Sequence, residues 1–144
     1  MIQISIQRLD PELPVPSPVR AGDAAADLPS RTDVTVPAGE RVLVPTGFAV
    51  AVPDGWCGLI LPRSGLALKH GITVLNSPGL IDSGYRGELQ VVLFNSSQGD
   101  FAVERGQRIA QLLICPAPAV EFVTVTELPA GPDDRGAQGF GSSG

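Results

Sequence analysis

The chain has 144 residues, enough for one domain with a core, and its apolar runs are shorter than the roughly 20 residues of a membrane-spanning helix. Its 10 basic and 15 acidic residues give a net charge of −5 without a basic run, which argues against nucleic acid or an anionic membrane as partner. Residues 2–7 alternate apolar and polar like a strand rather than a signal peptide, so we expect a cytoplasmic protein.

Glycine and proline are abundant, at 17 and 14 residues, and sustained helical periodicity is missing, which together predict an all-β fold. Short strands at a spacing of roughly 8–12 residues are typical of a sandwich or barrel. Residues 10–22 contain several prolines and should be irregular, and residues 64–70 could form one helical turn capped by Ser64. The expected strands are 2–7, 34–36, 41–44, 48–52, 56–61, 72–75, 88–95, 101–103, 108–114 and 120–127.

Two further features concern the organisation of the chain and its thiols. Residues 131–144 are rich in glycine and could not pack a core, so we expect a β domain over 1–130 and a flexible arm over 131–144. Cys57 and Cys115 lie far apart in the sequence in apolar surroundings, which predicts buried, reduced thiols.

Four stretches of the sequence contain residues that are suited to catalysis or ligand binding. Residues 62–67 place an arginine and a serine before a possible helix start, which suits an oxyanion, although a surface turn is the plainer explanation. Residues 76–88 form a loop with an amide, a carboxylate and a phenol, although a hairpin with an Asx turn at Asp82 would also explain it.

The other two stretches lie nearer the C-terminus. Gln111 is expected to share a strand face with the apolar Ile109, so its amide needs a hydrogen-bond partner or a ligand. Residues 135–144 combine glycines, serines and Phe140, which could approach a phosphate and stack on a base, although a disordered tail is the alternative.

Taken together and in order, these stretches resemble the motifs of the trimeric dUTP pyrophosphatases, the dUTPase family. The resemblance runs from about residue 20 to the end of the chain. Ala25, Ala26 and Gln138 stand where that family usually has other residues. The five matching stretches are 21–28, 62–67, 76–87, 105–111 and 135–144.

The resemblance implies a jelly-roll-like β subunit in a homotrimer, with active sites shared between subunits and closed by the C-terminal arm. It implies Mg²⁺-dependent hydrolysis of dUTP to dUMP and pyrophosphate by water attack on the α-phosphorus. Such an activity would limit uracil incorporation into DNA and supply dUMP for thymidylate synthesis.

The resemblance also implies roles for individual residues. Asp82 would orient and deprotonate the attacking water, Tyr85 would lie under the deoxyribose and exclude a 2′-hydroxyl, and Asp27 would hold hydrated Mg²⁺ through water. The implied substrate-binding residues form the nucleoside pocket, the phosphate-binding turn and strand, and the arm: Asn76, Gly79, Leu80, Ile81, Tyr85 and Gln90; Arg63, Ser64, Gly65 and Gln111; Arg135, Phe140, Gly141, Ser142 and Ser143.

Two other functions remain possible. A dCTP deaminase would share the fold, but the loop 80–85 and the glycine-rich C-terminus favour the hydrolase. A β-sandwich binding module without catalysis is the second alternative, against which the presence of Asp82, Tyr85, Arg63 and Phe140 argues.

Overall fold

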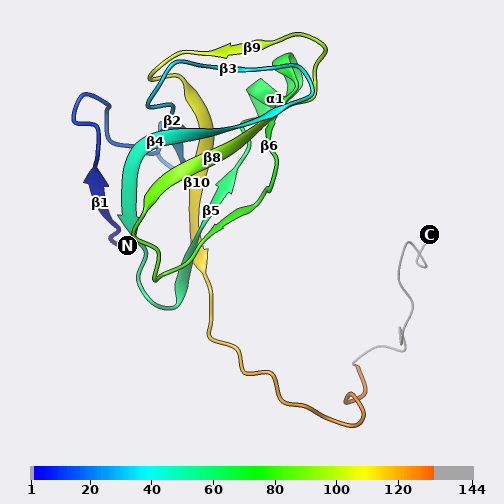
Figure 1. Ribbon diagram of the computed structural model, residues 1–144. Coiled ribbons are helices and arrows are strands. Elements are labelled where there is room, and N and C mark those ends of the chain that lie inside the picture. Colours follow the sequence, from blue (N-terminus) through cyan, green and yellow to red (C-terminus); the bar gives the residue numbers. More distant parts are fainter. Residues whose placement is uncertain (1, 132–144) are drawn as a thin grey trace.

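Two antiparallel four-stranded sheets enclose the core of the computed structural model, which describes residues 2–131 (Figure 1). A two-stranded ribbon and one short helix complete the fold. The first sheet has the order β1 (Ser5–Arg8), β4 (Arg41–Ala51), β8 (Glu88–Asn95) and β6 (Ile72–Val74). The second has the order β2 (Ala25–Pro29), β10 (Arg108–Pro116), β5 (Trp56–Leu61) and β7 (Gly79–Ile81), and the ribbon pairs β3 (Val34–Val36) with β9 (Phe101–Val103). This arrangement confirms the all-β, jelly-roll-like prediction.

The core lies between the two sheets because alternate side chains of both point inward. Along β8, Leu89, Val91 and Leu93 are fully buried, and they join one apolar cluster with Leu28 and Ile60 of the opposite sheet. Burial of this apolar surface is the main favourable term for the fold. The alternation leaves the outward side of each strand free to carry polar groups.

One buried polar side chain, Asn95, joins the end of β8 to the ribbon. Its Nδ2 donates to the Val36 carbonyl at 2.9 Å and to the Gly99 carbonyl at 2.8 Å, and its Oδ1 accepts from Ser97 N at 2.9 Å. A buried amide is tolerated when its donors and acceptor are paired in this way.

Strand β4 runs unbroken where the sequence predicts two strands over 41–44 and 48–52. Its pairing with β8 shifts between Pro45 and Ala49, and Gly47 in this irregular stretch has φ 81°. Residues 45–47, which are expected to form a turn, instead form a β-bulge, and the strand continues on both sides of it. The prediction of a break was therefore wrong.

The helix α1 (Ser64–His70) forms where a helical turn is expected, but Ser64 does not cap it. The N-cap position is Arg63, whose guanidinium has only donors and so cannot accept from the helix N–H groups; it donates to Asp27. Gly71 ends the helix with φ 66°, a left-handed conformation that favours glycine. None of the described residues forms a helix that is long and apolar enough to span a bilayer.

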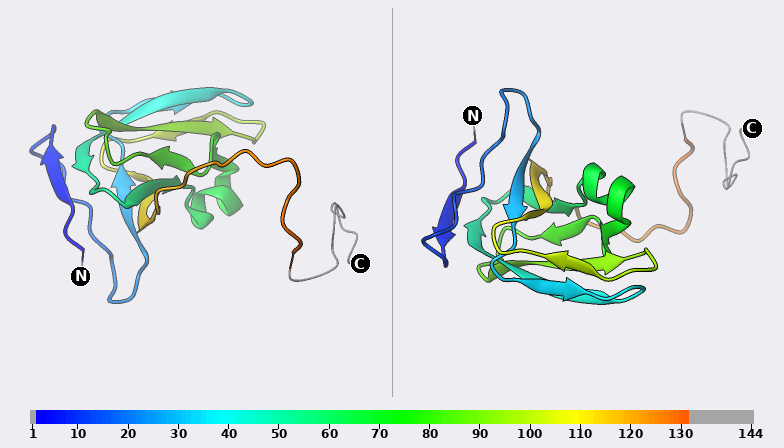
Figure 2. Two further views of the ribbon diagram at one scale, coloured as in Figure 1. Left: turned by 90° about the horizontal axis from the view of Figure 1, so that it is seen from below. Right: turned by 90° about the horizontal axis from the view of Figure 1, so that it is seen from above.

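Several other predictions need correction. Residues 120–127 are exposed and form no strand, and residues 117–131 leave the sheets after β10 as an extended segment (Figure 2). Strands β2 and β7 are real, although the sequence analysis treats them as parts of motif loops. The remaining strands agree with the prediction to within a few residues.

The prediction that Gln111 shares a face with Ile109 fails because of a register shift in β10. Pairing with β2 is irregular between Arg108 and Ala110, and Ile109 and Ala110 are both buried. The bulge therefore breaks the alternation at Ile109, which is buried in the core together with Ala110 and Leu112, whereas Gln111 lies on the opposite face.

The cysteines are free, in agreement with the prediction of buried, reduced thiols, but their burial differs from it. Cys57 and Cys115 are free but only half-buried, and they stand opposite each other on β5 and β10. The predicted division at residue 130 stays a prediction, since residues 132–144 lie outside the described part of the chain.

Candidate active site

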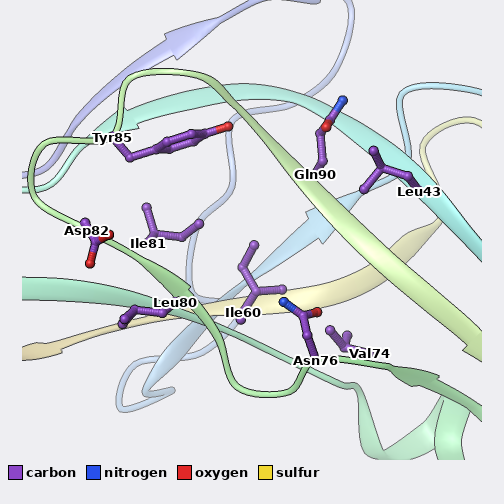
Figure 3. Close-up of a pocket in the computed structure, with 10 residues that line it drawn as sticks. Leu43, Ile60, Val74, Asn76, Leu80, Ile81, Asp82, Tyr85 and Gln90 are labelled. Carbon is purple, nitrogen blue, oxygen red and sulfur yellow. The ribbon is translucent and has the colours of Figure 1, made fainter.

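A pocket of about 290 Å³ opens where the loop after β7 passes over β4, β5 and β8 (Figure 3). The pocket brings together seven of the predicted site residues: Asn76, Gly79, Leu80, Ile81, Asp82, Tyr85 and Gln90. Three further residues complete the lining, namely Leu43, Ile60 and Val74. Most of the loop that the sequence singles out therefore surrounds one cavity.

Close packing of β7 on β5 positions the start of the loop. Ile81 pairs with Gly58, where an added Cβ would come within 3.1 Å of the Ile81 Cβ and of the Leu112 Cδ1. Only a residue without a side chain lets the two strands approach this closely. The chain then leaves the sheet at Asp82, whose exposed side chain stands at the rim of the pocket.

A turn after Asp82 brings Tyr85 over the pocket. Tyr85 N donates to the Asp82 carbonyl at 3.1 Å, and the Tyr85 hydroxyl donates to the Glu88 carbonyl at 2.9 Å. The ring remains 42% exposed, so its face is available to a ligand. The hydrogen bond between Asp82 and Tyr85 belongs to the backbone, so it leaves the Asp82 carboxylate free to take part in chemistry.

The floor of the pocket is apolar and its edge is polar. Ile60 and Val74 are buried, whereas Asn76 and Gln90 contribute amides (Figure 3). Such a combination suits a flat ring whose edge carries hydrogen-bonding groups. The sequence analysis missed Leu43, Ile60 and Val74 because apolar residues on strands look like ordinary core residues.

A second group of predicted residues gathers around Asp27 on β2. Arg63 Nε donates to Asp27 Oδ1 at 2.8 Å, and Arg108 Nη1 donates to Asp27 Oδ2 at 3.0 Å. One carboxylate thus holds two guanidinium groups, which leaves a local excess of positive charge. The planar guanidinium of arginine in such a setting is suited to bidentate binding of oxyanions such as phosphate.

The neighbouring predicted residues lie close to this group in the fold. Gln111 Nε2 donates to the Pro62 carbonyl at 2.9 Å, which supplies the partner that its amide requires. Gln111 also lines a second pocket of about 350 Å³ together with Asp27, Leu61 and Leu113. Ser64 and Gly65 are exposed at the start of α1, directly after Arg63.

The two groups do not share one cavity within the described chain. Arg63, Ser64, Gly65 and Gln111 are not among the residues that line the pocket beside Asp82. The predicted residues of the C-terminal arm lie outside the described residues: Arg135, Phe140, Gly141, Ser142 and Ser143. A single chain therefore brings together the nucleoside part of the predicted site and, separately, part of the phosphate-binding set.

The described residues do not form a protein cage for a metal ion. Within residues 2–131, no cluster of three or more histidine, cysteine, aspartate or glutamate side chains could hold one. Both carboxylate oxygens of Asp27 are engaged by arginines. An ion such as Mg²⁺, which often keeps its waters and is bound by phosphates of a ligand, does not require such a cage.

Comparisons with known proteins agree with one another. A family model described as dUTPase matches residues 11–144. The deoxyuridine 5′-triphosphate nucleotidohydrolase of Thermobifida fusca is 49% identical over 144 residues, covering 99% of this chain and 79% of that protein. The enzyme of the same name from Nocardia farcinica is 51% identical over 142 residues, covering 98% of this chain and 85% of that protein. Among solved structures, the dUTPase of Staphylococcus bacteriophage 80alpha with dUpNHpp has a TM-score of 0.91 and 28% identity, and the match covers 100% of this chain and 99% of that chain.

Proposed function

Since this chain belongs to the dUTPase family, we infer that it hydrolyses dUTP to dUMP and pyrophosphate. The observation that carries the inference is the pocket that places Asp82, Tyr85 and Asn76 around one apolar floor. Hydrolysis of dUTP would limit uracil incorporation into DNA and supply dUMP for thymidylate synthesis.

We propose that Asp82 is the general base. Its carboxylate accepts a proton from a water whose oxygen forms a new bond to the α-phosphorus. The bond from that phosphorus to the oxygen bridging the β-phosphate breaks, and pyrophosphate leaves with the electron pair. The exposed position of Asp82 at the pocket rim supports this role, because a base must lie within hydrogen-bond reach of its water.

The same pocket would select the nucleoside. Uracil would lie on the apolar floor with its polar edge near Asn76 and the backbone of 79–82. Gln90, on β8, also lines this pocket. A thymine methyl group would clash in a closely fitting pocket, and cytosine would present the wrong hydrogen-bonding edge. The Tyr85 ring, held by its hydroxyl, would leave no room for a ribose 2′-hydroxyl.

We propose that the triphosphate is bound by a second group of residues. Arg63, oriented by Asp27, would pair with phosphate oxygens, and Ser64, Gly65 and Gln111 would add hydrogen bonds. Residues of the arm would close the site through a phosphate contact of Arg135, stacking of Phe140 on the base, and hydrogen bonds from Gly141, Ser142 and Ser143.

A homotrimer with shared sites would bring these groups together. Within one chain, Arg63 and Gln111 do not line the pocket beside Asp82, so another subunit is needed to supply them to that pocket. This separation supports the proposal that each active site combines residues from neighbouring copies.

Mg²⁺ is the proposed cofactor, and when bound it would offset the charge of the phosphates and of the leaving pyrophosphate. The phosphates themselves would hold the ion with its waters, and the contribution of Asp27 through water stays a prediction. The substrate is a polyanion that cannot cross a bilayer unaided, so the enzyme must share its compartment, which we propose to be the cytoplasm.

Pyrophosphate release with Mg²⁺ from dUTP, UTP, dTTP and dCTP, measured side by side, tests the proposal. We expect release from dUTP alone and a loss of about 10²–10⁴-fold in Asp82→Asn. Asp100→Asn is the matched control, because its amide oxygen can still accept from Ala38 N in a remote turn. Ammonia release from dCTP would instead favour the deaminase, and inactivity toward all four nucleotides would favour the binding module.

A further inference from the structure

Two cysteine thiols face each other on the neighbouring strands β5 and β10, beside the loop that contains Asp82. Cys57 of β5 and Cys115 of β10 are partners in the antiparallel register, and their Sγ atoms are 3.5 Å apart. Both cysteines are free and half-buried, so a small reagent can reach them. Neither thiol lines the nucleoside pocket, and neither has a part in the proposed reaction.

The backbone at this pair has the spacing that a disulfide needs. Ala117 N donates to the Gly55 carbonyl at 2.8 Å, two positions beyond the pair in the same register. Hydrogen-bonded and non-hydrogen-bonded pairs alternate along antiparallel strands, so Cys57 and Cys115 form a hydrogen-bonded pair with Cα atoms about 5.5 Å apart. Disulfides usually join Cα atoms about 4.4–6.8 Å apart, so side-chain rotation can close the bond without moving the strands.

We propose that Cys57 and Cys115 are a reversible modification site that forms a cross-strand disulfide with a small-molecule disulfide as oxidant. One thiolate attacks the oxidant, forms a mixed disulfide and releases one equivalent of small thiol. The second cysteine, as its thiolate, attacks the mixed disulfide and releases the other equivalent. Two protein thiols are oxidised to one disulfide, and one oxidant molecule is reduced to two thiols.

The surroundings of Cys57 influence how the reaction is best measured. The hydrogen bond with Cys115, partial burial and the nearby Asp82 charge all raise the pKa of Cys57 above its usual value. A raised pKa leaves less thiolate for attack, so the exchange is slow even where the disulfide is favoured. The position of the equilibrium, rather than the rate, is therefore the informative quantity.

The pair also lies directly beside the proposed base. Gly58 pairs with Ile81, and continuing that register by one residue places Asp82 opposite Cys57. The crosslink would join β10 to the strand on which β7 and the Asp82 loop are built. Intact mass and free-thiol content report on this crosslink independently of the enzymatic activity.

The experiment equilibrates the full-length protein in buffers of increasing oxidised-to-reduced glutathione ratio, then traps free thiols and measures intact mass. We expect loss of both thiols, a mass lower by two hydrogen atoms, a monomeric chain on a non-reducing gel, and reversal by excess reduced glutathione. Half of the native protein should carry the disulfide at an oxidised-to-reduced glutathione ratio at least about tenfold lower than the ratio needed for the same chain in denaturant. We expect this difference because the fold holds the two thiols close together.

The Cys115→Ser variant is the matched control, and we expect it to acquire one glutathione adduct at most and no internal crosslink. Cys57→Ser should behave likewise, so a folding defect in one variant does not remove the control. Persistence of both free thiols, glutathione on both, a crosslink between chains, or equal midpoints for native and denatured protein would overturn the proposal.

Discussion

The Tyr85 hydroxyl donates a 2.9 Å hydrogen bond to the Glu88 carbonyl and thereby folds its ring back over Gly87. A Cβ added at Gly87 would lie 2.5 Å from the hydroxyl oxygen and 2.7 Å from Cζ, closer than real Cβ atoms come to such neighbours. The position of the ring at the nucleoside pocket therefore depends on a glycine two residues further along the chain.

Substituting Gly87→Ala should displace the Tyr85 ring and relax selection against a ribose 2′-hydroxyl. We expect the ratio of kcat/KM for dUTP to that for UTP to fall by about tenfold, because discrimination by steric fit weakens when the wall moves. Steady-state pyrophosphate release with both nucleotides measures this ratio.

The control for this experiment lies in the same loop. Gly84 has no atom within 4 Å of an added Cβ, so Gly84→Ala should leave the ratio unchanged. An unchanged ratio in Gly87→Ala as well would show that the Tyr85 ring does not set sugar selectivity.

Glu88 supports both the β4 bulge and the start of β8. Its Oε1 accepts from Gly47 N at 2.8 Å, and both of its carboxylate oxygens are 3.4 Å from Arg31 Nη1. Glu88→Gln weakens both interactions because it removes the charge, and we expect the free energy of unfolding to fall by about 1–2 kcal/mol.

Urea denaturation of the two proteins measures this difference. Glu40→Gln, an exposed glutamate in the turn before β4, is the matched substitution and should change stability little. Equal losses in the two variants would mean that the bulge does not depend on the Glu88 carboxylate.

Arg105 links the N-terminal segment to the turn before β10, and this link should respond to pH. Arg105 Nη2 lies 2.8 Å from Asp10 Oδ2 and 3.0 Å from Glu12 Oε2. The hydrogen bond from Arg105 lowers the pKa of Asp10 below its usual value. A depressed folded-state pKa means that the stabilisation is present above the unfolded value of about 3.9 and is lost as pH falls through the folded pKa.

We therefore expect the loss of Tm caused by Arg105→Gln to be largest near pH 6 and to shrink as the pH falls to 3 and below, because protonation of Asp10 removes its ion pair with Arg105. Thermal unfolding across this pH range, with Arg41→Gln on an exposed strand residue as control, measures the effect. A Tm difference that is constant across the range would contradict the assignment to Asp10.

Much of the fold could be predicted from local pattern. The segments 34–36, 56–61 and 88–95 have the expected bounds because apolar residues, turns and strand ends coincide there. The family and the all-β architecture are likewise confirmed. The local sequence pattern failed where contacts with other strands determine the structure. The bulge at Gly47 lets β4 continue where the residues themselves suggest a turn.

Residues 120–127 illustrate the opposite error. Their alternation of apolar and polar residues resembles that of a strand, but no partner strand pairs with them in the described chain, and Phe122 is 95% exposed. Strand formation requires a neighbour with free backbone groups, which a sequence pattern does not reveal.

The site shows the same division between local and long-range information. The loop residues Asn76, Asp82 and Tyr85 lie within one stretch of ten residues and meet in one pocket as expected. The contact of Arg63 with Asp27 joins residues 36 positions apart, and no sequence spacing indicates it. Long-range ion pairs of this kind depend on which strands become neighbours.

Asp27 provides a test that separates two roles for one carboxylate. Its hydrogen bonds with Arg63 and Arg108 suggest that it positions Arg63 for the triphosphate, whereas the family resemblance implies a contact with hydrated Mg²⁺. In Asp27→Asn the amide still accepts one hydrogen bond but no longer neutralises the two guanidinium groups. If positioning is its role, KM for dUTP should rise severalfold while the Mg²⁺ concentration for half-maximal activity stays unchanged. Titrating Mg²⁺ at saturating dUTP, with Asp100→Asn as control, makes the comparison, and a shift of the Mg²⁺ curve without a change in KM would assign Asp27 to the metal instead.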